Sequence, residues 1–151
     1  MTLSKTSQYA VRAALYLARQ NDRVRASDIA EDLDVPTNYL SKILHILGRN
    51  EILDSERGPH GGFRLARPPE EITLAEVVGA FDEMTPDQRC LLGRSRCRDH
   101  DPCPAHERWK EVSERVYGFF EETKLTDLLG PEAPALDTSP EQGGEIGAAS
   151  R

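Results

Sequence analysis

The chain has 151 residues, of which 38% are hydrophobic, enough for one modest domain or a small domain with an appendage. Its apolar runs are only a few residues long and residues 1–20 lack the pattern of a secretory signal, so we expect no membrane-spanning helix and a cytoplasmic location. The net charge is −7, but residues 1–67 carry 10 Lys and Arg against 8 Asp and Glu, a net of +2. A phosphate backbone responds to local charge, so the overall acidity does not exclude DNA.

Three helices are predicted at the start of the chain. Residues 6–20 place apolar side chains at helical spacing, and Ser27 is the expected N-cap of a short helix over 28–33. After a turn at Asp34 and Val35, Pro36 is expected at the first position of a third helix that runs to about Arg49. One apolar stripe marks the inner face of this helix: Leu40, Ile43, Leu44 and Leu47.

The pattern then changes to two short strands, over 52–57 and 62–66, joined by a glycine-rich hairpin loop over 58–61. Thr73 and Glu76 have the spacing of a capping box that opens a helix ending near residue 81. An irregular stretch over 84–103 precedes the longest predicted helix, over 104–122, which carries Trp109 on its apolar side. Residues 131–151 have the composition of a disordered tail.

Three helices followed by a two-stranded hairpin is the element order of a winged helix-turn-helix, so the predicted fold class is mainly α with a two-stranded β wing. Residues 1–67 form the predicted DNA-binding domain and residues 68–83 a connecting helix. A cysteine-rich loop over 84–103, a helix and its end over 104–130, and the tail over 131–151 complete the predicted organisation.

The outer face of the third helix carries hydrogen-bonding side chains of a length that reaches base edges and phosphates. The predicted DNA-binding residues are Thr37, Asn38, Ser41, Lys42, His45 and Arg49 on this helix, with Arg57, His60 and Arg64 on the hairpin. A polar helix face is more often simply solvated. The turn, the hairpin and the basic balance of residues 1–67 together favour binding to double-stranded DNA.

The three cysteines of the chain, Cys90, Cys97 and Cys103, lie close to His106 in the spacing C-x6-C-x5-C-x2-H. Structural zinc sites usually contain close C-x2–4-C pairs, which this loop lacks, so the wide spacing favours an iron–sulfur cluster with zinc as the alternative. A disulfide switch or metal-free thiols are further readings. Four arginines interleave with the cysteines and would offset thiolate charge: Arg89, Arg94, Arg96 and Arg98.

The sequence resembles the Rrf2 family of bacterial transcription regulators, of which IscR, NsrR and RirA are members. The resemblance covers about residues 1–130 and rests on LSKTSQYAVRAALYLA, DIAEDLDVPTNYLSKILHILGRN, RGPHGGFRLARPPEEITLAEVVGAFD and CPAHERW. It implies a homodimer, in which the helix starting near Pro104 is the dimerisation helix and the helix over 36–49 reads DNA.

The resemblance leaves the fourth ligand open. In IscR-like members a histidine matching His106 completes a [2Fe-2S] cluster, whereas in NsrR-like members an acidic residue near the N-terminus ligates a [4Fe-4S] cluster. Gln8 stands at that acidic position here and is a poor iron ligand, so [2Fe-2S] is preferred. The six-residue gap after Cys90 is nearer to the NsrR and RirA pattern. Further candidate ligands are Asp99, His100 and Asp101.

These observations predict a homodimeric DNA-binding regulator whose cluster senses redox state, iron or cluster supply, or nitric oxide. A zinc-stabilised or cluster-free repressor of the same fold is the alternative. A small iron–sulfur redox or carrier protein is the alternative from another class. Asp82 and Glu83 are not accompanied by a nucleophile or a substrate-pocket signature, and the chain is not expected to be an enzyme.

Overall fold

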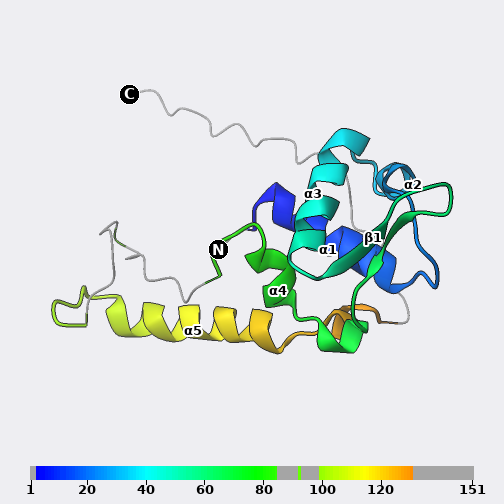
Figure 1. The fold of residues 1–151 in the computed structure, drawn as a ribbon. Helices are drawn as coiled ribbons and strands as arrows, with labels where there is room; N and C mark the ends of the chain where they lie inside the picture. The colour runs from blue at the N-terminus through cyan, green and yellow to red at the C-terminus, as the bar shows by residue number, and fades with distance from the viewer. Residues whose placement is uncertain (1–2, 85–91, 93–98, 131–151) are drawn as a thin grey trace, which may run out of the picture.

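A computed structural model describes residues 3–84, 92 and 99–130 of the chain, and these residues are mainly helical (Figure 1). The main elements are α1 (Lys5–Ala18), α2 (Ala26–Asp32), α3 (Thr37–Arg49), β1 (Leu53–Glu56), β2 (Gly62–Leu65), α4 (Leu74–Gly79) and α5 (His106–Glu122). Short 3-10 helices, η1 (Pro69–Glu71) and η2 (Leu125–Leu128), flank α4 and α5. The predicted fold class is confirmed, whereas most of the cysteine-rich loop and the tail over 131–151 lie outside the described residues.

The two strands form an antiparallel hairpin in which Leu53 pairs with Leu65 and Glu56 pairs with Gly62. A bridge between Val24 and Phe63 joins the linker before α2 to this hairpin. The prediction that Ser27 caps the second helix is wrong, because α2 is preceded by Arg25, whose extended backbone makes no side-chain capping bond. The bridge at Val24 keeps the chain extended up to this point, so the helix begins directly after it.

The third helix also begins one residue later than predicted. Pro36 has an extended backbone, with ψ at 128°, and is the N-cap of α3 rather than its first helical residue. The predicted apolar stripe of α3 is buried, as expected. It packs in one core with α1 and α2, whose buried side chains are mostly small: Ala10, Ala13, Ala14, Leu17, Ile29 and Ala30. Small residues on α1 let neighbouring elements approach it closely from several sides.

Helix α5 packs against α4 near its C-terminal end, and its N-terminal end lies away from α1, α2 and α3 (Figure 1). Leu74, Val78 and Phe120 form a small second core between α4 and α5. The predicted single apolar side of this helix is divided, because Phe120 is buried while Val112 is 50% exposed and Phe119 is 55% exposed. No helix within residues 3–84 and 99–130 is long and apolar enough to cross a membrane.

The predicted capping box of α4 is confirmed, since Thr73 accepts from the backbone N–H of Glu76 and the Glu76 carboxylate accepts from the backbone N–H of Thr73. At the other end of α4, Asp82 is held by the start of α1. The hydroxyl of the fully buried Ser7 donates to Asp82 Oδ2 at 2.6 Å, and the backbone N–H of Ser4 donates to the same oxygen at 3.1 Å. The Ser7 hydrogen bond lowers the pKa of the Asp82 carboxyl, which is therefore ionised at neutral pH. Asp82 has a structural role and joins α1 to the chain that leads into the cysteine-rich loop.

We predict that Ser7→Ala lowers the free energy of unfolding by about 1–3 kcal/mol, because the Asp82 carboxylate then loses a buried donor. Denaturant unfolding measures this difference. Ser27→Ala is the matched control, since Ser27 is exposed and caps no helix, and it should stay within about 0.5 kcal/mol of wild type. Equal effects of the two substitutions would contradict the structural role of the Ser7–Asp82 contact.

Candidate functional site

The outward face of α3 carries the predicted DNA-binding side chains of that helix. Burial of the apolar stripe leaves five of the six exposed, and Ser41 is half-buried: the exposed five are Thr37, Asn38, Lys42, His45 and Arg49. The turn between α2 and α3 sets the direction of α3 and is tight. Asp34 adopts φ 53° there, and the Val35 N–H donates to the Ala30 carbonyl at 2.9 Å. Aspartate tolerates this left-handed conformation better than most residues.

The start of α3 is also fixed to α1 by an aromatic side chain that the sequence analysis did not single out. The Tyr39 hydroxyl and Thr6 Oγ1 share a hydrogen bond of 2.7 Å, and the Tyr39 ring packs edge-on against Tyr9. Tyr39 lies beside Asn38 in the first turn of α3. The position of the predicted DNA-reading end of this helix therefore depends on α1.

We call the hairpin over residues 53–65 the wing. A groove of about 330 Å³ lies between α3 and the wing. His45 and Arg49 line it from α3, and Phe63 lines it from the wing. The His45 ring packs edge-on against Phe63 with ring centres 5.7 Å apart. This contact brings the predicted residues of the helix next to those of the wing.

The wing tip presents Arg57 and His60, both exposed, and Arg64 lies exposed on β2. The tip is held from behind by Arg25, whose Nη2 donates to the Pro59 carbonyl at 2.8 Å. Arg25 was not predicted as a site residue, because its partner lies far away in the sequence. The wing thus has basic groups at its tip and on the face of β2 that carries Arg64.

Close packing of the wing on the linker requires glycine at position 62. Gly62 has φ 141°, and a Cβ atom there would lie 2.6 Å from the Val24 carbonyl oxygen. The same stretch forms the two bridge hydrogen bonds, Val24 N–H to the Phe63 carbonyl at 2.9 Å and Phe63 N–H to the Val24 carbonyl at 2.8 Å. The wing can therefore reach this position only because Gly62 has no side chain.

Two of the four predicted metal ligands, Cys103 and His106, lie within the described residues, whereas Cys90 and Cys97 lie outside them. The backbone N–H of His106 donates to the Cys103 carbonyl at 2.9 Å, so both residues belong to the turn that opens α5. His106 is only 4% exposed. The part of the chain that the structure describes holds no cluster of three or more potential metal ligands.

The His106 ring is oriented by a carboxylate. Its Nε2 atom lies 2.9 Å from Asp99 Oδ1, which also accepts from Lys110 Nζ at 3.4 Å. The hydrogen bond from His106, followed by that from Lys110, holds the pKa of the Asp99 carboxyl below its usual range. Among the other residues considered as ligands, His100 and Asp101 are exposed. Gln8 is exposed on α1, where its amide donates to the Leu3 carbonyl at 3.0 Å.

Comparison with known proteins by sequence gives the family of this chain, and comparison by structure gives the same fold. Residues 3–131 match the Rrf2 family, described as an iron-dependent transcriptional regulator. The chain belongs to the Rrf2 family. It is 36% identical to the HTH-type transcriptional regulator IscR of Photorhabdus laumondii over 131 residues, which cover 85% of this chain and 79% of that protein.

Two solved structures share the fold of this Rrf2 chain. The global cysteine regulator CymR of B. subtilis superimposes with a TM-score of 0.73 at 19% identity, covering 85% of this chain and 96% of that one. IscR of T. potens gives a TM-score of 0.68 at 22% identity, covering 85% and 86%. The matched relatives are named as transcriptional regulators and not as enzymes, in agreement with the expectation from the sequence.

We predict that Gly62→Ala in this Rrf2 chain destabilises the fold by more than about 1 kcal/mol, because alanine resists a positive φ and its Cβ would meet Val24. Gly118→Ala in α5 is the matched control: no atom of the described residues crowds the added Cβ, and helix propensity should raise stability by up to about 1 kcal/mol. Denaturant midpoints measure both. A Gly62→Ala midpoint equal to that of wild type would contradict the close-approach argument.

Proposed function

We propose that this chain is a homodimeric transcriptional regulator of the cytoplasm, whose binding to a double-stranded operator is controlled by an iron–sulfur cluster. Residues 1–67 bind DNA in this proposal, residues 68–83 connect, residues 84–103 carry the cysteine-rich loop and residues 104–130 form the dimer. Membership of a family of transcriptional regulators supports the DNA-binding part. Control by a cluster rests on one observation, the buried His106 placed within one turn of Cys103.

The donor set fits an iron–sulfur cluster. Thiolates of Cys90, Cys97 and Cys103 with the imidazole of His106 are iron ligands known in proteins. A ligating histidine usually bonds a carboxylate through its second ring nitrogen, and the contact of His106 Nε2 with Asp99 has this form. When bound, a cluster supplies a centre whose state changes with oxidants, iron supply or nitric oxide.

The dimer face of the proposal is the exposed side of α5. Val112 and Phe119 are two turns apart on one side of the helix, and both expose about half of their surface. Alignment of two large exposed apolar groups on one side of a charged helix favours an interaction surface there. A second copy related by a two-fold axis would bury the same residues on both chains.

The proposed route from the cysteine-rich loop to DNA runs through α1. Asp82 lies just before the loop and is held by Ser7, while the neighbouring Thr6 is bonded to Tyr39 at the start of α3. A displacement of the loop root would therefore reach the reading helix through two hydrogen bonds on one helical turn. Two reading helices must match half-sites about 34 Å apart, so a small displacement would change operator affinity.

We predict about two iron atoms and two sulfides per chain in anaerobically isolated protein, with a [2Fe-2S] Mössbauer spectrum. His106→Ala should lower the iron content or change the spectrum, because it removes the proposed fourth ligand. The matched control His100→Ala changes an exposed histidine of the same region and should leave both unchanged. A colourless protein with stoichiometric zinc would contradict the cluster and favour the zinc-stabilised repressor. Loss of iron from His100→Ala alone would overturn the choice of His106.

We predict that Phe119→Arg converts the dimer to a monomer in sedimentation experiments, since it places a charge in the proposed apolar interface. Glu114→Arg introduces the same side chain at an exposed position on another side of α5 and should leave the dimer intact. A Phe119→Arg protein that still sediments as a dimer would place the interface elsewhere.

A further inference from the structure

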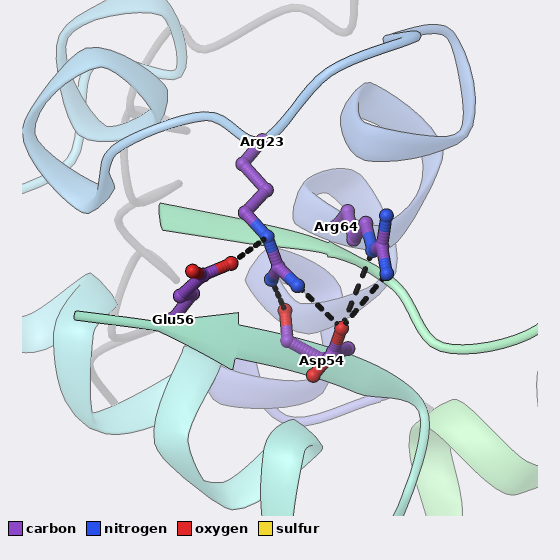
Figure 2. Close-up of polar contacts among 4 residues, drawn as sticks. All are labelled: Arg23, Asp54, Glu56 and Arg64. Carbon is purple, nitrogen blue, oxygen red and sulfur yellow. Dashed lines mark hydrogen bonds and ion pairs between the residues drawn. The ribbon is translucent and has the colours of Figure 1, made fainter. Parts of the chain in front are cut away.

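A cluster of four charged side chains joins the wing to the linker that precedes α2 (Figure 2). Arg23, from the linker, donates through Nη2 to Asp54 Oδ2 at 2.6 Å, through Nη1 to the Asp54 carbonyl at 3.1 Å and through Nε to Glu56 Oε2 at 3.0 Å. The Arg23 side chain is 16% exposed. Its guanidinium is thus enclosed by three acceptors of β1.

Arg64 is the looser partner in this cluster. Its Nη2 and Nε atoms lie 3.2 Å and 3.3 Å from the same Asp54 oxygen, and its side chain is 58% exposed. Arg23, more than Arg64, holds the pKa of the Asp54 carboxyl below its usual range. Asp54 would therefore keep its bonds to Arg23 if Arg64 turned to another anion. The same exchange by Arg23 would break three contacts.

The two carboxylates matter because of where they lie. Asp54 and Glu56 are on the same face of β1, two residues apart, directly before the basic tip at Arg57. Two unpaired carboxylates on a hairpin that approaches DNA would repel the phosphates. The formal charges of Asp54 and Glu56 are balanced by those of Arg23 and Arg64 together. The remaining formal charge on the wing is the positive charge of Arg57 at its tip.

We propose that Arg23 is a positioning residue for DNA binding, which bonds both Asp54 and Glu56 and offsets part of their charge, so that Arg64 can exchange Asp54 for a backbone phosphate. Arg23 itself does not reach DNA. This inference rests on the proposed DNA-binding role of residues 1–67. It assigns a function to a linker residue that lies outside both the reading helix and the wing tip.

The test measures binding of the full chain to a fluorescein-labelled mixed-sequence duplex, because a phosphate contact does not depend on sequence. Arg23→Gln should weaken binding by roughly tenfold at about 50 mM salt, and the difference should shrink as salt rises. Adding Asp54→Asn and Glu56→Gln to the Arg23→Gln chain should restore most of the affinity. The matched control is Lys124→Gln, which removes one positive charge outside residues 1–67 and should bind as wild type.

Unchanged binding of Arg23→Gln, or no recovery on removal of the carboxylates, would overturn the inference. No recovery would indicate instead that Arg23 contacts DNA or only supports the fold. If Arg23→Gln does not fold, Glu56→Gln provides the test: it should bind more tightly than wild type, whereas the exposed control Glu70→Gln should not. Equal binding of these two variants would also overturn the inference. A wild-type chain that fails to bind the duplex at low salt would contradict the proposed function itself.

Discussion

Two backbone hydrogen bonds between Val24 and Phe63 hold the wing against the helical core, and they form only because Gly62 lets β2 approach the linker at Val24. The bridge has consequences in both directions along the chain. On one side it keeps the linker extended, so that α2 begins at Ala26. On the other side it turns Phe63 toward His45 and Arg64 to the opposite face of the hairpin. The wing, the linker and α3 are therefore one packed unit.

Helix α1 has a comparable role, although none of the predicted site residues belongs to it. Its alanine-rich face allows α3, α4 and the hairpin to pack closely on one helix. Its first turn carries the polar contacts of Ser7 with Asp82 and of Thr6 with Tyr39. These contacts join segments that are far apart in the sequence. Asp82, just before the cysteine-rich loop, and the start of α3 are therefore both bonded to the first turn of α1.

Features that depend on local sequence were predictable. The buried stripe of α3 follows from helical spacing, and the capping box of α4 follows from Thr73 and Glu76, three residues apart. The start of α2 was not predictable, since it is set by the bridge between Val24 and Phe63 of the distant hairpin. Position within the helix likewise did not show that Phe120 is buried while Phe119 is exposed, because this depends on the direction in which α5 crosses α4.

The same distinction separates the expected site residues from those that were missed. Exposed polar residues of α3 and the wing tip can be listed from periodicity alone. Arg23 and Arg25 act through partners more than thirty residues away, Asp54 and Pro59, which only the folded hairpin brings near them. The predicted metal ligands were predictable only in part. The sequence shows that Cys103 and His106 are three residues apart, but only the fold shows that Asp99 orients the His106 imidazole.

Pairing of charges within the protein explains how an acidic chain can act on a polyanion. The net charge of −7 predicts repulsion at long range, yet exposed charges farther apart than about 8–10 Å are largely screened at physiological salt. What DNA meets at contact is the local arrangement. On the wing, Asp54 and Glu56 are already bonded to Arg23, and the guanidinium left most exposed in that cluster is Arg64. Because pairing within the protein decides which charges remain available, the inferred effect of Arg23 on DNA affinity acts through local geometry and not through the net charge of the whole chain.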